Sequence, residues 1–169
     1  TTSKKAVPRG SIYDSQGRVL VGNKPKLSIN YTRPADAKAS KMLEIAKKLT
    51  SLISVDTSEL KERDLKDYWV ALNPDKLDGL LTAEEKKQIS KENLSASQTY
   101  EMQLAHISSD ELNYSEAEKQ VIAIFTKMNS AYSLSTVTLK NEGVTEQEVA
   151  KISERLGELR GVDIDSDWD

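Results

Sequence analysis

Thirteen residues near the start of the chain decide the fold: Arg9-Gly10-Ser11-Ile12-Tyr13-Asp14-Ser15-Gln16-Gly17-Arg18-Val19-Leu20-Val21. Residues 11–13 and 18–21 are short runs of the residue types that favour strands. Asp14 and Ser15 favour a turn because their side chains bind their own backbone, and Gly17 tolerates a positive φ. The pattern therefore predicts a β-hairpin with a loop of a few residues.

A second turn cluster follows the hairpin at residues 22–25, and a regular alternation comes next. Leu27, Ile29 and Tyr31 occupy every second position, which is typical of a strand with one buried face. Pro34 ends this run. The first third of the chain thus predicts a three-stranded, mostly antiparallel unit.

Beyond the first third, the hydrophobic residues recur at the spacing of amphipathic helices. One helix is predicted through residues 42–53. A second helix, capped by Thr57 or Ser58, is expected to stop at Asn73 and Pro74. Three further helix starts are predicted at capping boxes, which open at Thr82, Ser115 and Thr145.

Two more β-like runs remain, one at residues 134–140 and one around Val162 and Ile164. The predicted order is a small antiparallel sheet unit at the N-terminus, then an amphipathic-helix-rich region with two further short strands. This order predicts the α+β fold class rather than a regular βαβ series.

The composition narrows the classes of protein to consider. The 169 residues contain 37% hydrophobic residues, enough for one core or for one core and a smaller subdomain. The absence of cysteine excludes a disulfide framework, thiolate metal sites and a cysteine nucleophile. No apolar run approaches the roughly 18–20 residues of a membrane span.

The charge is unevenly distributed along the chain. Residues 1–50 carry eleven Lys and Arg against three Asp and Glu, whereas the remainder carries thirteen against twenty-four. Such asymmetry is typical either of a surface that faces an anionic partner or of an ordinary mixed-charge surface. The basic first third lacks the interleaved aromatic residues of a nucleic-acid platform, so no nucleic-acid partner is predicted.

One tetrapeptide matches a catalytic motif. Ser58-Glu59-Leu60-Lys61 fits S-x-x-K, in which the amine of Lys helps to remove the proton of the Ser hydroxyl one helical turn away. The companion S-x-N element occurs only upstream, at residues 28–30, and K-[TS]-G is absent. The tetrapeptide is therefore interpreted as the start of a helix.

Two other features could suggest a site. His106 is the single histidine and has no Ser or Cys partner by motif, so a structural or surface role is favoured. The acidic tail at residues 163–169 is similar to the start of a calcium loop, but Trp168 stands where Gly is required. It is interpreted as the solvated face of a strand. No catalytic, cofactor-binding or metal-binding residues are predicted.

The opening stretch resembles the R-G-x-I-x-D-x-x-G-x-x-L-A signature of class B penicillin-binding proteins. Val21 replaces the usual Ala, and Ser15 stands where Arg is frequent. Weaker similarities at residues 31–33, 60–69, 112–119, 161–164 and 167–169 look like the Gram-positive, elongation-type members. The resemblance assigns a structural or interaction role to Arg9, Gly10, Ile12, Asp14, Gly17 and Arg18.

The resemblance implies a non-catalytic pedestal, also called the dimerisation domain, on the extracytoplasmic face of the cell membrane. Residues 1–8 would be a membrane-proximal linker and residues 9–169 the pedestal, with a helix-rich insertion at about 56–132. The transmembrane anchor and the transpeptidase domain would lie outside this chain. Arg9 and Asp14 either hold the hairpin or help to dock the pedestal on the catalytic domain.

The implied partners are the chain's own transpeptidase domain, a SEDS-family glycosyltransferase and other elongation-complex proteins, and a homodimer is left open. No cofactor is implied. Two alternatives come from the residues alone: a hydrolase or transferase that uses Ser58 and Lys61, and a free-standing extracellular module that binds anionic wall polymer through its basic first third.

Overall fold

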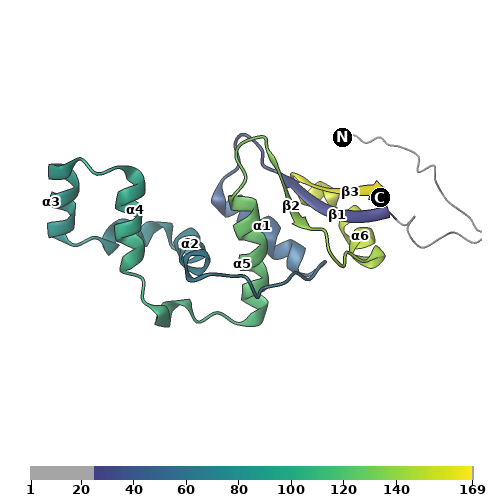
Figure 1. Ribbon diagram of the computed structural model, residues 1–169, viewed down its shortest axis with the longest axis horizontal. Helices are drawn as coiled ribbons and strands as arrows, with labels where there is room; N and C mark the ends of the chain where they lie inside the picture. Colours follow the sequence, from purple (N-terminus) through teal and green to yellow (C-terminus); the bar gives the residue numbers. More distant parts are fainter. Residues whose placement is uncertain (1–24, 169) are drawn as a thin grey trace, which may run out of the picture. The chain divides into compact units, whose positions relative to one another are not determined.

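The computed structural model describes residues 25–168, whose helices and strands are drawn in Figure 1. The predicted linker at residues 1–8 and the predicted hairpin lie outside the described residues, and so do all six family-motif residues: Arg9, Gly10, Ile12, Asp14, Gly17 and Arg18. The described part is α+β, as predicted. No helix in residues 25–168 has the length and apolar character that a membrane crossing requires.

The described chain divides into two compact units. The first contains residues 25–37, 51–53 and 127–168, and the second contains residues 38–50 and 54–126. The sheet lies in the first unit, and most of the helices lie in the second.

The sheet of the first unit has three antiparallel strands in the order β2-β1-β3. They are β1 (Pro25–Thr32), β2 (Thr136–Lys140) and β3 (Val162–Trp168), and Figure 1 shows β1 in the middle. The predicted strand at residues 27–32 is confirmed. Both strands that pair with β1, however, come from the C-terminal third of the chain. They are the two further strands that the sequence predicts.

Strand β2 is shorter than predicted. The β-like run begins at residue 134, but Leu134 has φ 65, a left-handed conformation that interrupts an extended strand. The strand therefore starts only at Thr136. Strand β2 has a bulge at Leu139, because Ile29 pairs with Lys140 while the next residue of β1, Asn30, pairs with Thr138.

Helix α6 (Glu146–Ser153) follows β2 and begins at the predicted capping box. The Thr145 hydroxyl accepts from the backbone N–H of Glu148, whose carboxylate in turn accepts from the backbone N–H of Thr145. A short 3₁₀ helix, η5 (Leu156–Glu158), leads to β3. The core of this unit is built from fully buried side chains on the strands and on the segment between them, including Ile29, Tyr31, Leu139, Ile152 and Leu159.

Helix α1 (Ala39–Thr50) opens the second unit and is shorter than the predicted helix, which extended to residue 53. The Thr50 hydroxyl donates to the carbonyl of Lys47 and so satisfies an acceptor that the last turn leaves free. Leu52 and Ile53 are buried, but they lie beyond the helix and belong to the first unit.

Helix α2 (Glu62–Leu72) begins later than predicted, because Lys61 rather than Thr57 or Ser58 is its N-cap. The backbone N–H and the hydroxyl of Ser58 both donate to Asp56, which holds residues 56–58 in a turn. The predicted stop is confirmed, since the backbone N–H of Asn73 donates to the carbonyls of Trp69 and Val70 and ends the helix.

The rest of the second unit consists of short helices. The capping box at Thr82 is confirmed, and the Ser115 hydroxyl accepts from the backbone N–H of Glu118 at the start of α5. In chain order these helices are η2 (Pro74–Lys76), η3 (Asp78–Leu80), α3 (Ala83–Glu92), α4 (Ala96–Ala105), η4 (Ser109–Leu112) and α5 (Glu116–Asn129).

Two aromatic side chains organise the core of the second unit. Trp69 packs with Leu104, Ile107 and Leu112 in one buried cluster. The neighbouring Tyr68 makes edge-on ring contacts with Tyr114 and with Phe125, at centroid distances of 5.2 and 6.3 Å. Such edge-to-face pairs add to the stabilisation that burial provides.

Candidate functional site

Ser58 and Lys61 do not have the geometry of an activated nucleophile. Both residues precede α2, and Lys61 has an extended backbone with φ −110 and ψ 162. The Ser58 hydroxyl donates to Oδ2 of Asp56 at 2.9 Å. Because the two residues do not share a helical turn, the structure does not bring the amine to the hydroxyl in the way that the S-x-x-K chemistry requires.

His106 connects two helices of the second unit. Its Nε2 lies 2.7 Å from Oε1 of Glu85, and Glu85 also accepts from the backbone N–H of Thr82. The Thr82 bond, followed by the bond to the His106 ring, lowers the pKa of Glu85 below its usual range. This arrangement joins the C-terminus of α4 to the first turn of α3, which is the structural role that the sequence favours.

A pocket of about 350 Å³ lies in the second unit, but its charges neutralise one another. Arg63, which lines it, contacts Asp67 and Glu101 at 3.1 and 2.6 Å, and its guanidinium lies over the ring of Tyr100. The other cation, Lys66, lies 3.6 Å from Glu62 in the same lining. The contacts resemble those of a surface ion-pair network more than those of a ligand site.

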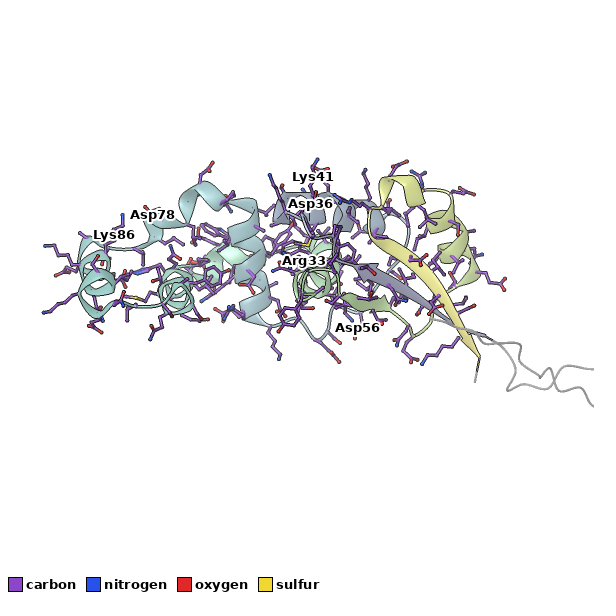
Figure 2. The ribbon with its side chains drawn as sticks, turned by 90° about the horizontal axis from the view of Figure 1, so that it is seen from above. Arg33, Asp36, Lys41, Asp56, Asp78 and Lys86 are labelled. Atoms are coloured by element: carbon purple, nitrogen blue, oxygen red, sulfur yellow. The ribbon has the colours of Figure 1, made fainter. Side chains whose placement is uncertain are left out.

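Other charged pairs of the second unit lie at its surface. Lys86 of α3 lies 3.6 Å from Asp78, and Figure 2 labels both residues.

The acidic tail is the strand β3, as interpreted from the sequence. Among residues 25–168, no group of three or more His, Asp or Glu side chains could hold a metal ion.

The first unit contains the most exposed large apolar side chains of the described residues. Tyr132 is 84% exposed and Leu134 is 71% exposed, and both lie in the loop between α5 and β2. This segment, residues 131–135, is called the apolar loop below. Sequence reasoning missed it, because Tyr and Leu beside a strand are read as core residues and no sequence signal distinguishes them here.

The apolar loop is held firmly by Arg33, the residue after β1, which is labelled in Figure 2. The backbone N–H of Leu134 donates to the carbonyl of Arg33 at 2.7 Å, and the Arg33 guanidinium donates to the carbonyl of Ala131 at 2.8 Å. The backbone N–H of Ser135 closes the turn on Tyr132. These bonds maintain a left-handed Leu134, a conformation that costs about 1–2 kcal/mol for a residue with a Cβ.

The first and the last residue of the described sheet lie at the same end of it. Pro25, the first residue of β1, is paired with Trp168, the last residue of β3. The apolar loop and Gly161 lie beside the other end of β1, next to Arg33 and Thr32. The first unit therefore places its apolar loop at the end of the sheet opposite to Pro25 and Trp168.

Comparison with known proteins identifies the family. Residues 4–169 match the model of the penicillin-binding protein dimerisation domain. The chain belongs to this family. It is 41% identical to penicillin-binding protein 2A of Bacillus subtilis (strain 168) over 165 residues, which are 97% of this chain and 23% of that protein.

Further relatives are penicillin-binding proteins 2B of Streptococcus pneumoniae. That of serotype 4 (strain ATCC BAA-334 / TIGR4) is 32% identical over 164 residues, or 95% of this chain and 24% of the relative. The solved structure of the protein from strain 5204 has a TM-score of 0.68 at 32% identity and covers 98% of this chain and 25% of its own. The chain thus spans about a quarter of the length of its relatives.

These findings confirm the resemblance seen in the sequence. The chain is the pedestal, or dimerisation, domain of a class B penicillin-binding protein, a family of cell-wall synthesis. The specific roles assigned to Arg9, Asp14 and the other motif residues concern a segment outside the described residues and stay predictions.

Proposed function

We propose that this chain is the non-catalytic scaffold of a peptidoglycan DD-transpeptidase that β-lactams target. The observation that carries the proposal is the 41% identity to penicillin-binding protein 2A over 97% of this chain but only 23% of that protein. A domain that makes up a quarter of its relatives leaves room for a separate catalytic domain. The scaffold would hold that domain above the extracytoplasmic face of a membrane to which the parent is anchored.

The sheet suits this role. Because β1 and β3 are neighbours, chain segments attached before Pro25 and after Trp168 would begin about 5 Å apart. A membrane anchor on one side and a catalytic domain on the other would then be attached at one end of a sheet that eleven paired positions stabilise. We further propose the domain layout expected from the sequence, with residues 1–8 as a linker and a helix-rich subdomain at about 56–132.

The proposed partners follow from the same family. They are the chain's own transpeptidase domain and, for an elongation-type parent, a SEDS-family glycosyltransferase with the other proteins of the elongation complex. The geometry of Ser58 and Lys61 supports a scaffold over an independent hydrolase, because the serine is bonded to Asp56 and the lysine lies outside the helix.

Labelling with a fluorescent penicillin tests the proposal. The 169-residue chain is expected to remain unlabelled, whereas the parent protein with its remaining domains is expected to form a covalent adduct that survives denaturing electrophoresis. Ser58→Ala in the parent should leave labelling unchanged. Labelling of the 169-residue chain itself, or loss of labelling in the Ser58→Ala parent, would refute the scaffold role.

A further inference from the structure

The two edges of the sheet differ in what they offer to another strand. Within the described residues β1 is central, so β2 and β3 each have one edge that no described strand pairs with. Such edges present unpaired N–H and C=O groups to any chain that can approach. Natural proteins usually block these edges with charges or with competing contacts. Strands β3 and β2 differ in this kind of protection.

The edge of β3 is protected against a second copy of itself. Asp occupies alternate positions along β3, so an antiparallel pair of β3 on β3 centred on Asp165 places Asp opposite Asp. The backbone N–H of Thr32 donates to the carbonyl of Gly161, so by alternation Ser166 points away from β1. Its N–H is already bonded to Oδ1 of Asp165 at 3.0 Å.

Among residues 25–168, the edge of β2 has no such protection. The backbone N–H of Arg33 donates to the carbonyl of Ser135, so Ser135 faces β1 and, by alternation, Thr136 and Thr138 direct their peptide groups outward. Both threonines are exposed. The only charged residue of the strand is Lys140, whose amine lies 2.9 Å from a carboxylate of α6 and is thereby neutralised.

Strand β2 is also compatible with itself. In an antiparallel pair centred on Thr138, that residue faces the partner's Thr138 and Thr136 faces the partner's Lys140, so no like charges meet. Opposed threonines on neighbouring strands can share a hydrogen bond, as the hydroxyls of Thr32 and Thr136 already do within this sheet at 2.7 Å. The same pairing on β3 would instead bring carboxylates together.

The apolar loop adds side-chain contact to this edge. It immediately precedes β2, so in an antiparallel pair it would lie beside the C-terminal end of the partner's β2. Tyr132 and Leu134 are held in place by the bonds to Arg33, which reduces the entropy that they lose on binding. A segment with no acidic residue between Lys127 and Lys140 also brings no carboxylate into such a contact.

We propose that a second copy of this chain docks on the β2 edge, with β2 paired antiparallel to β2 about Thr138 and the two apolar loops packed over the ends of the joined strands. The family description speaks of dimerisation but assigns it to no surface. A five-residue strand and two large side chains per copy form a small interface, for which we expect a Kd of about 10–500 µM.

Sedimentation velocity of the 169-residue chain from about 5 to about 500 µM covers this range of Kd. The sedimentation coefficient should rise with concentration. Thr138→Pro removes an outward N–H without breaking the ladder to β1 and should weaken association at least about tenfold. Ser166→Pro removes the matching outward N–H on β3 and should leave association unchanged.

A second variant covers the case in which Thr138→Pro fails to fold. Tyr132→Ser combined with Leu134→Gly leaves the β2 backbone intact and accepts the left-handed φ at residue 134, so it should keep the far-ultraviolet circular dichroism of the parent while weakening association. Two results would overturn the proposal. One is a monomer at every concentration, which would point to residues 1–24, another domain or lipid as the occupant of the edge. The other is equal weakening by Ser166→Pro.

The dimer proposal does not depend on the proposed function. Labelling by penicillin reports only on the presence of a transpeptidase site, and sedimentation reports only on the β2 edge. A chain that dimerises while its parent is not labelled would refute only the proposed function. A chain that stays monomeric while its parent is labelled would refute only the dimer.

Discussion

A graded series of glycine substitutions tests how the first unit is assembled, and Gly161 is its most informative position. Gly161 has φ 90, and a Cβ placed there would lie 2.5 Å from the carbonyl oxygen of Thr32 and 2.9 Å from Cε1 of Tyr31. A backbone oxygen of the central strand cannot move aside cheaply. Gly161→Ala should therefore combine backbone strain with steric overlap, and it should lengthen the hydrogen bond from Thr32 to Gly161.

The magnitude follows from two matched controls. Gly143 has φ 68 but nothing within 4 Å of the position of a Cβ, so Gly143→Ala should introduce backbone strain without overlap. The net loss in the free energy of unfolding should be about 1 kcal/mol, because the lower entropy of the unfolded chain offsets part of the strain. Gly157→Ala meets neither a positive φ nor a close atom, so it should raise the free energy of unfolding by at most about 1 kcal/mol. Gly161→Ala adds overlap and should cost about 2–4 kcal/mol.

Urea unfolding followed by circular dichroism gives the free energy of each variant, and hydrogen exchange of the Thr32 amide reports locally on the bond to Gly161. The expected order of destabilisation is Gly161→Ala, then Gly143→Ala, then Gly157→Ala. If Gly161→Ala costs no more than Gly143→Ala, then the close approach of β1 to the start of β3 does not limit this position and the reasoning fails.

Two further predictions concern polar contacts. Lys140→Met removes the amine that contacts the largely buried carboxylate of Glu148 and should cost about 3 kcal/mol in urea unfolding, whereas Lys26→Met at an exposed pair should cost less than about 1 kcal/mol; equal costs would contradict the burial. Burial, followed by its bond to a glutamate, raises the pKa of Tyr68, so its stabilising effect is complete below the ordinary tyrosine pKa and is lost as the pH rises above about 10. Tyr68→Phe should flatten the alkaline decline in melting temperature, and an unchanged decline would assign it to other groups.

Several local features of the structure could be predicted from the sequence because they depend on neighbours along the chain. The capping boxes at Thr82 and Thr145 each need only a hydroxyl and a glutamate three residues apart. The stop of α2 at Asn73 follows from the proline after it. The family was also recognisable, since its signature is contiguous.

Other features failed for reasons that local patterns do not contain. The predicted start of α2 at Thr57 or Ser58 was wrong because Asp56 competes for the backbone and hydroxyl of Ser58, while Thr57 donates to Glu116, 59 residues away. The strand predicted at residues 134–140 is present, but its predicted start was two residues too early, because the contact with Arg33 holds Leu134 in a left-handed conformation.

The sequence by itself determined the fold class, several helix starts and the family, because each of these depends on periodicity, on caps or on a contiguous motif. Only the tertiary structure decided that β1 lies between β2 and β3, which are separated from it by about a hundred residues or more. Alternation shows that a strand has a buried face but carries no information about its partner. The exposure of Tyr132 and Leu134 is likewise visible only in the structure, because it depends on which other parts of the chain pack over them.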